Sequence, residues 1–436
     1  MGTLEQASVH VFHPGCPLFG HYNHYSDILV SQSVTLAAPM STRSSSPVSH
    51  RGLILILAML TAFAPFATDM YLPGFGQMAL AFHTDNGRIE STLSAFFLGL
   101  ALGQALYGPL IDRFGRRVPL LIGVGLFIAT TIGCLLTRDI SVFTALRVVQ
   151  AIGGCAGMVI GRAIVSDLFD SSESARVLSL LLMLVTLAPI VAPLLGGWIL
   201  IIAGWQAIFV FMLVFALICG VLVWFHVPET LPSSRRTPLR LSQVMRTYGE
   251  LCRRPAFIVP TLVGGLAQAC MFAFITGSPF VFMGLFDVGE QQYGWLFGLN
   301  ALGVVACAQA NRIGLRRWPV QKLLGAALCL NLVAGLALVA SAQTSHLVVL
   351  MVPLWVAIAS LGFIGGNAAA VAMDASGEHA GSGSALIGTL QFGCAFLVSS
   401  LVAAAQNGTA YPMALAIAAA GLLATVLWFA TARIRR

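Results

Sequence analysis

The stretch HVPETLPSSRRTPLRLSQVMRTYGELCRR, residues 226–254, is the one long polar run after residue 51, and it holds six arginines. Apolar runs flank it on both sides, and each is close to the 20 or so residues that a membrane-spanning helix needs. The sequence therefore predicts an all-α membrane protein with twelve transmembrane helices in two six-helix pseudo-repeats. The predicted spans are 52–71, 91–111, 118–136, 141–163, 176–199 and 205–225, then 256–281, 292–311, 322–341, 346–370, 383–405 and 411–431.

The composition supports a lipid environment. Of the 436 residues, 58% are hydrophobic and only 9% are charged, whereas a soluble domain carries roughly 25% charged residues. We therefore expect the lipid bilayer to surround most of the chain. The predicted divisions are an N-terminal extension that is disordered or mis-annotated (1–50), an N-terminal six-helix half (51–225), a cytoplasmic linker (226–254) and a C-terminal six-helix half (255–436).

The distribution of Lys and Arg predicts the orientation in the membrane. With the N-terminus inside, 19 of the 23 basic residues fall on the cytoplasmic side, and only Arg88 and Arg138 fall outside. Cytoplasmic loops of membrane proteins carry such an excess of positive charge. We therefore predict a multi-pass protein of the bacterial inner membrane with both termini in the cytoplasm. The same bias explains the net charge of +7 without nucleic acid as a partner.

Residues 1–50 are polar and hold five of the nine histidines. Four of them, with one cysteine, are spaced like metal ligands: His10, His13, Cys16, His21 and His24. We weigh a metal site against a disordered tail or an upstream translated stretch, with Met40 as a natural start, and predict no metal. The nine cysteines are scattered without a C-x-x-C pair, so no disulfide framework is predicted.

Two charged residues lie well inside predicted spans of the N-terminal half, and a third, Arg162, lies at the inner end of the fourth span. An ionisable group in a span is costly, and it is usually functional. Asp69 is the only acidic residue that these boundaries place within a helix, and Arg147 lies at a similar depth in the fourth span. We predict that they carry proton coupling as partners, directly or through water and Gln150. The alternatives are that Asp69 caps its helix and that Arg147 forms a structural ion pair or reaches the interface.

Apart from Lys322, the first residue of 322–341, spans 7–12 contain no charged side chain within these boundaries, so coupling is expected in the N-terminal half. Aromatic, Met and amide side chains are predicted to bind substrate, although each could instead pack in the core. These residues are Tyr71, Gln150, Met271, Phe274, Asn300 and Gln391.

Two further motifs predict bends and gating contacts. The fifth span reads APIVAPLLGGW (188–198), in which prolines remove backbone donors and glycines permit close helix approach. The turn GPLIDRFGRR (108–117) has a degraded echo at 311–317, which indicates an internal repeat. The predicted gating or structural residues are Gly108, Asp112, Arg113, Gly115, Arg116, Arg162, Pro189, Pro193, Gly196 and Gly197.

These motifs resemble those of the major facilitator superfamily. GPLIDRFGRR is similar to its loop 2–3 signature, and LRVVQAIGG (146–154) is similar to the helix 4 signature of proton-linked members. APIVAPLLGGW resembles the antiporter signature, with Ala192 where the family often has Gly. ATDMYLPGF (67–75) is similar to the Bcr/CflA drug-resistance transporters. The resemblance implies drug efflux driven by proton entry, with Asp69 and Arg147 at matching positions.

The sequence thus favours a drug:proton antiporter that works by alternating access, with small molecules and protons as its partners. Proton-linked uptake or metabolite export by the same fold is the alternative. No P-loop and no H-E-x-x-H motif is present, so neither a nucleotide-driven pump nor a membrane-embedded zinc enzyme is predicted. We expect no cofactor and a monomer, and the sequence does not identify the substrate.

Overall fold

The computed structural model describes residues 50–236 and 241–432 of the chain, and within these ranges every regular element is a helix. The predicted extension and its histidine cluster therefore lie outside the described residues, apart from His50. The helices before residue 230, here called the first half, are α1 (His50–Thr61), α2 (Phe63–Asp69), the short η1 (Leu72–Gly74), α3 (Phe75–Ala81), α4 (Asn86–Phe114), α5 (Arg117–Leu136), α6 (Ile140–Leu168) and α7 (Ser171–His226).

The polar stretch that divides the sequence holds a short turn and one amphipathic helix, and the remaining long helices follow it. This part comprises η2 (Ser233–Arg235) and α8 (Leu241–Cys252), and then the second half: α9 (Pro255–Pro279), the π-helical η3 (Phe280–Leu285), α10 (Glu290–Gly314), α11 (Val320–Ser341), α12 (Leu347–Ser376), η4 (Gly377–His379), α13 (Ala380–Ala404) and α14 (Tyr411–Ala430).

Ten continuous helical segments in the described residues are long and apolar enough to cross a membrane. Two of them, Ser172–His226 and Leu347–Ala404, have 55 and 58 residues. At 1.5 Å per residue each is roughly 80 Å long, more than twice the thickness of the bilayer core. Each bends at a glycine with positive φ, Gly204 (φ 76°) and Gly377 (φ 56°). Each therefore crosses twice, and the twelve passes agree with the prediction.

Aspartates begin three of the long helices. Asp85 accepts a hydrogen bond from the backbone of Arg88, and Asp139 accepts from Ser141 and Val142. Asp170 caps α7 in the same way. The bonds from the Val142 and Ser141 N–H groups hold the pKa of Asp139 below its usual range. These carboxylates accept hydrogen bonds from backbone N–H groups at the helix starts, which would otherwise lack acceptors. This is the role that Asp commonly has at an N-cap.

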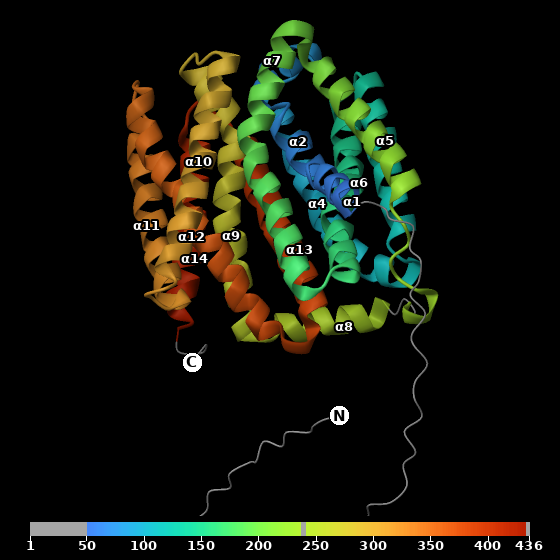
Figure 1. The fold of residues 1–436 in the computed structure, drawn as a ribbon. Coiled ribbons are helices and arrows are strands. Elements are labelled where there is room, and N and C mark those ends of the chain that lie inside the picture. Colours follow the sequence, from blue (N-terminus) through green and yellow to red (C-terminus); the bar gives the residue numbers. More distant parts are fainter. Residues whose placement is uncertain (1–49, 237–240, 433–436) are drawn as a thin grey trace, which may run out of the picture. The chain divides into compact units, whose positions relative to one another are not determined.

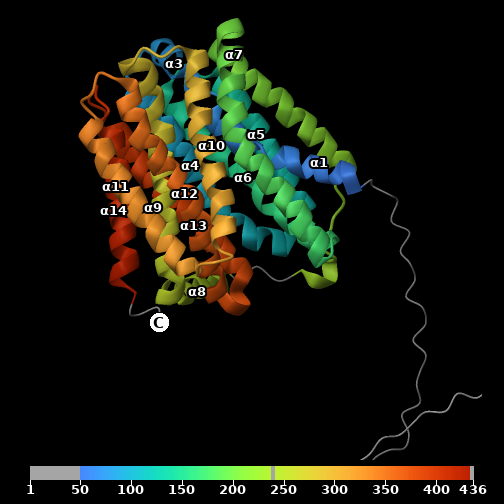
Figure 2. The ribbon, with the colours of Figure 1, turned by 60° about the vertical axis from the view of Figure 1, so that its left-hand side comes forward.

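Figure 1 shows α8 lying across one end of the bundle, while the bend of α7 lies at the other. We call these the linker end and the opposite end. The halves meet along two helix pairs, α4 with α13 and α7 with α10, and the rotated view in Figure 2 shows α10 beside α7. Polar contacts between the halves, described below, lie near the opposite end.

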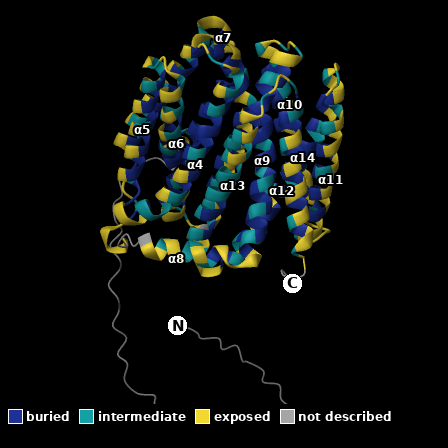
Figure 3. Cartoon of the chain, turned by 180° about the vertical axis from the view of Figure 1, so that it is seen from behind, coloured by how far each residue is buried: buried dark blue, intermediate teal, exposed yellow. Residues whose placement is uncertain are grey.

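Large apolar side chains cover the outward faces of many helices. Figure 3 shows exposed residues along α5, α11 and α14. Other helices also expose large apolar side chains, for example Ile202 (84% exposed) and Phe225 (73%) on α7 and Trp295 (69%) on α10. A water-soluble protein rarely exposes so much contiguous apolar surface. The exposed surface therefore suits lipid, and the helical content confirms the prediction of an all-α membrane protein.

Candidate functional site

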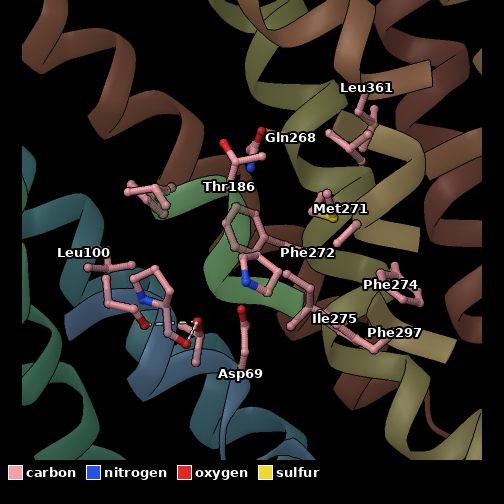
Figure 4. A pocket seen from close by; sticks show the side chains of 18 of the residues that line it. Asp69, Leu100, Thr186, Gln268, Met271, Phe272, Phe274, Ile275, Phe297 and Leu361 are labelled. Carbon is pink, nitrogen blue, oxygen red and sulfur yellow. Dashed lines mark hydrogen bonds between the residues drawn. The ribbon is translucent and has the colours of Figure 1, made fainter. Parts of the chain in front are cut away.

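A cavity of about 280 Å³ lies between the two halves. It is lined by α2, α4, α6 and α7 of the first half and by α9, α10, α12 and α13 of the second (Figure 4). Its wall is apolar and aromatic, and the polar side chains among its described lining residues are Thr68, Asp69, Thr186 and Gln268. Asp69 is the single ionisable group among them. The wall can thus desolvate an apolar molecule and offer it one carboxyl group.

Asp69 is buried, with 2% of its surface exposed, and its side chain points toward the cavity (Figure 4). Its Oδ1 atom has no hydrogen-bond partner among the described residues. The neighbouring Thr68 hydroxyl donates to the Ala64 carbonyl at 3.0 Å. A buried polar atom without a partner is rare in native structures, and it often marks a functional position.

The position of Asp69 depends on a break in the first membrane pass. Helix α2 ends at Asp69, and the chain continues as a turn and the short η1 before α3 begins. Pro73 lies in the first turn of η1, where its missing N–H is tolerated. Gly196 of α7 packs against the same break, because a Cβ atom there would collide with the carbonyl oxygen of Met70. Two helices therefore meet next to the carboxyl group.

Arg147 lies at the centre of the first half and is fully buried. Its guanidinium donates to the Gln150 side chain at 2.6 Å and to the Ala67 carbonyl at 2.6 Å. The same group stacks on two aromatic rings, at 4.3 Å from the ring centre of Phe96 and 4.5 Å from that of Tyr71. Such cation–π contacts stabilise a cation that lies away from water.

Of the two forms predicted for the partnership of Asp69 with Arg147, direct or through water and Gln150, the direct ion pair is not present. None of the ion pairs found between described residues includes either side chain. Arg147 instead binds the backbone of Ala67, two residues before Asp69. The reason is local, because the end of α2 turns the Ala67 carbonyl toward Arg147 and the Asp69 carboxyl toward the cavity. The two residues are linked through one short stretch of backbone.

Two residues predicted to bind substrate belong to this arginine site. Gln150 accepts from Arg147 and donates to the Thr131 hydroxyl at 2.7 Å, while the Tyr71 hydroxyl lies 3.2 Å from that of Thr92. Gln150 and Tyr71 are both fully buried, and neither lines the cavity. Their partners are protein groups, so in this conformation they support Arg147 rather than a ligand.

The second half contributes the aromatic wall. Met271 and Phe274, both predicted from the sequence, line the cavity on α9. Phe272 and Gln268 lie on the same wall (Figure 4), and the sequence analysis did not predict them as binding residues. Several residues of α9 line the cavity. The amino-acid composition of such an apolar helix does not show which of its side chains face the cavity and which pack against neighbouring helices.

The two predicted amides of the second half lie elsewhere. Asn300 on α10 is fully buried, and its amide donates to the Leu296 carbonyl at 2.9 Å. Gln391 on α13 is partly buried beside Gly264. Neither is among the residues that line the cavity. The side-chain oxygen of Asn300 has no hydrogen-bond partner within the described part of the chain, which marks it as an unusual core residue rather than as a wall residue.

A second buried acid escaped the sequence prediction. Glu90 is fully buried on α4, so the expectation that Asp69 is the only acidic residue inside a helix is wrong. The predicted span began at residue 91, whereas α4 begins at Asn86. The signal that could have corrected the boundary is Asp85, a helix-capping residue type directly before the helical stretch.

The motif in α7 links the cavity to the contact between the halves. Pro189 lines the cavity, and both Pro189 and Pro193 lie within the continuous helix α7. One turn further on, a Cβ atom at Gly197 would lie 3.0 Å from the Glu290 carbonyl of α10. The glycines predicted to permit close approach are therefore in contact, Gly196 with the first pass and Gly197 with the second half.

Side-chain hydrogen bonds join the halves near the opposite end. The Gln406 amide donates to Glu90 at 3.0 Å, and the Gln77 amide donates to Glu290 at 3.3 Å. The backbones also approach closely there, since a Cβ atom at Gly87 would lie 2.7 Å from the Ala403 carbonyl. The cavity lies on the linker side of these contacts.

Charged side chains hold the turn at the linker end, and three of the predicted gating residues take part in the contacts there: Asp112, Gly115 and Arg116. Arg116 binds Asp112 at 3.0 Å and Asp167 of α6 at 3.0 Å. Gly115 has φ 88°, and a Cβ atom there would clash with the Glu229 carboxylate. Arg113 is exposed. Asp167 thus joins α6 to the turn through Arg116.

Glu229, which follows α7, binds the backbone of the same turn between α4 and α5. It accepts hydrogen bonds from the backbone N–H groups of Arg116 at 2.8 Å, Leu231 at 3.0 Å and Arg117 at 3.3 Å. Partial burial acts to raise the pKa of Glu229, but these hydrogen bonds and the nearby Arg236 outweigh it, so the pKa lies below its usual value. The carboxylate is therefore a structural anion of the turn.

Arg162 and Gly108 lie on a second cavity, of about 520 Å³, at the linker end. The wall of this cavity includes Gln104 of the first half and Tyr248 of α8. The Arg162 guanidinium donates to the Met158 carbonyl one turn earlier, at 3.1 Å. Met158 itself lines the first cavity, so this hydrogen bond joins a wall residue of the second cavity to a wall residue of the first.

Comparison with known proteins identifies the family to which the chain is similar. The model of the Major Facilitator Superfamily matches residues 57–399. The bicyclomycin resistance protein homolog of Haemophilus influenzae is 31% identical over 383 residues, which is 86% of this chain and 95% of that protein. The chloramphenicol resistance protein of Pseudomonas aeruginosa is 31% identical over 314 residues, or 71% of each chain.

Solved structures share the fold at lower identity. A bacterial homolog of the human lysosomal transporter Spinster has a TM-score of 0.69 and 17% identity, covering 89% of this chain and 98% of that one. The xylose transporter XylE from E. coli also has a TM-score of 0.69, with 13% identity and the same coverage. The arrangement of helices is thus one that known transporters use.

Proposed function

The chain belongs to the major facilitator superfamily and is a transporter rather than an enzyme, and from this premise we propose that it expels drug-like molecules in exchange for protons by alternating access. The observation that carries the proposal is Asp69, a buried carboxyl group with an unpartnered oxygen on the wall of an otherwise apolar cavity. Its relatives include proteins named for resistance to bicyclomycin and to chloramphenicol, which supports drug efflux.

The cavity suits an apolar or amphiphilic substrate. Phe272, Phe274 and Phe297 give it aromatic surface, and Gln268 and Thr186 add hydrogen-bonding groups. Apolar pockets with a few polar groups bind small molecules by burying most of their surface. Binding of this kind depends on shape and aromatic contact, which favours a range of related compounds over a single one.

Exchange requires that substrate and proton compete for one site. An ionised carboxylate in an apolar cavity is costly unless a cation or a proton neutralises it. Asp69 faces the cavity, and the ion pairs found between described residues do not give it a basic partner. A substrate that carries a positive charge can therefore replace the proton at Asp69, and a proton taken up after substrate release resets the carrier.

For the orientation, we propose that the linker end faces the cytoplasm of a bacterial cell, with both termini on that side of the inner membrane. The excess of Lys and Arg near the linker supports this. The moving units would be the two six-helix halves, residues 51–225 and 255–436, in a monomer. The contacts near Glu290 would then separate when the site opens to the outside.

The experiment uses the purified chain in proteoliposomes that contain a pH-sensitive dye. Addition of ethidium, an aromatic cation, on the substrate-loading side is expected to cause proton movement in the wild type, and Asp69→Asn is expected to abolish it. Asp139→Asn is the matched control, because this exposed acid caps α6 and Asn caps helices equally well. Expression in an efflux-deficient host measures resistance in parallel.

Wild-type resistance equal to the empty vector, together with no substrate-induced proton movement for any compound tried, would refute drug:proton exchange. Undiminished coupling in Asp69→Asn would exclude Asp69 as the proton carrier. Accumulation of the labelled compound inside cells would support the alternative of uptake, since an exporter lowers the internal concentration.

A further inference from the structure

Glu90 is the second fully buried acid of the first half, and the mechanism above does not use it. It lies on the second turn of α4, near the opposite end, where the two halves are in contact. One carboxyl oxygen accepts from the Gln406 amide, which belongs to the second half, at 3.0 Å. The other oxygen, Oε2, has no hydrogen-bond partner among the described residues.

The surroundings of Glu90 are acidic. It lines a cavity of about 350 Å³ between the halves, whose wall also carries Asp287 and Glu290 from the second half. On its own helix the nearest charges are the capping Asp85 and the exposed Arg88. The ion pairs found between described residues do not include Glu90. No cation thus neutralises the group when the halves are closed around it.

An unneutralised carboxylate is costly to bury, whereas a neutral carboxyl group that keeps its bond to Gln406 is far less so. In the closed arrangement the carbonyl-type oxygen accepts from Gln406, and a proton on Oε2 would remove the charge. When the halves separate, the bond to Gln406 breaks and water reaches the carboxyl group, which can then ionise.

We propose that Glu90 is a second proton-binding site, distinct from Asp69, and that it must take up a proton for the opposite end to close. The proposal rests on the proposed alternating access, because only an opposite end that opens can expose Glu90. Proton uptake there would favour the closed state, in which the drug cavity lies on the linker side. The direction agrees with proton entry from outside.

The dependence of closure on pH has a definite upper limit. If closure binds one proton at Glu90, the ratio of closed to open molecules changes by at most about tenfold per pH unit over the range in which the group titrates. Acidification shifts the equilibrium toward closure. If Glu90 does not titrate, the ratio does not depend on it.

The test measures hydrogen exchange of the peptides that contain Glu90 and Gln406, in the full chain in nanodiscs, between pH 5 and pH 8. Rates are corrected for the intrinsic effect of pH, and both peptides are expected to become more protected as pH falls. Glu90→Gln keeps an acceptor for Gln406 and removes the charge, so it is expected to stay protected at every pH. Asp287→Asn, at an exposed acid of the same cavity, is the matched control and should keep the wild-type pH dependence.

A Glu90→Gln variant with the full wild-type pH dependence would overturn the proposal, and so would a wild type without any. The Asp69→Asn variant separates this proposal from the proposed function. It is expected to lose drug-coupled proton movement and to retain the pH-dependent protection at Glu90. Loss of that protection in Asp69→Asn, with Glu90 intact, would show that Asp69 alone controls closure.

Discussion

Replacing Arg147 by Ala tests whether the buried guanidinium organises the proton-coupling region. The substitution removes two hydrogen bonds of 2.6 Å, to Gln150 and to the Ala67 carbonyl, and leaves both acceptors buried. A hydrogen bond from a charged donor contributes about 1.5–3 kcal/mol, and a desolvated cation–π contact about 1–2 kcal/mol. Because such terms are not additive, we expect a loss of about 3–6 kcal/mol in the free energy of unfolding.

Arg147→Lys is expected to restore part of that stability. An ammonium group keeps the charge, but it lacks the flat fork that reaches Gln150 and Ala67 while stacking between Tyr71 and Phe96. The assay is denaturant unfolding of the purified variants in detergent, followed by drug-coupled proton movement in liposomes.

Arg138→Ala is the control for this series, because that side chain is exposed at the start of α6 and lies outside the arginine site. It should unfold and transport like the wild type. An Arg147→Ala variant that unfolds within 1 kcal/mol of the wild type (about the error of such extrapolations) and still couples drug to proton would refute the reasoning.

Three further substitutions test other parts of the fold. Gly196→Val would push α7 away from the Met70 carbonyl and should strongly reduce transport. The control Gly125→Ala, where no atom lies near the added Cβ, should leave transport unchanged. Both predictions are checked by measuring transport rates of the folded variants, and an unchanged rate in Gly196→Val would contradict the first. Glu229→Gln should destabilise the protein at neutral pH. Because the folded pKa of Glu229 is lowered, its stabilisation is present above the usual value of about 4.3 and disappears as pH falls through the folded pKa. Wild type and variant should therefore unfold alike in strong acid, and a constant difference across pH would contradict this. Phe272→Ala enlarges the aromatic wall of the cavity and should change the order of preferred drugs more than the proton coupling, as a resistance panel would reveal.

The helical architecture was predictable because it depends on long apolar runs and on the basic linker, which are properties of local composition. The passes agree with the predicted spans to within a few residues at most ends, yet α4 begins five residues before its predicted span at 91. That small difference hid Glu90, because a group that seems to lie in a loop is not expected to be buried. Boundaries matter most where a charged residue lies near them.

The candidate site was predictable only in part. A carboxyl group inside an apolar run is visible in any sequence, so Asp69 was found, and the structure places it on the cavity wall. The partners of Arg147 were not visible, because a backbone carbonyl such as that of Ala67 has no signature in the side chains. The position of Phe272 on the cavity wall was not visible either. Whether this side chain faces the cavity or packs against a neighbouring helix depends on the rotation of α9 about its axis, which the sequence does not reveal.

The backbone around Asp69 explains how a proton could act on helices that the carboxyl group does not touch. Arg147 holds the carbonyl of Ala67, two residues before Asp69, and Gly196 packs on the carbonyl of Met70, one residue after it. The next residue of α7, Gly197, lies against Glu290 of the second half. A change of charge at Asp69 that shifts the end of α2 must therefore strain either the arginine bond or the contact of α7 with α10. Since closely packed helices move as discrete alternatives rather than by continuous deformation, the contact between the halves is where that strain would be released.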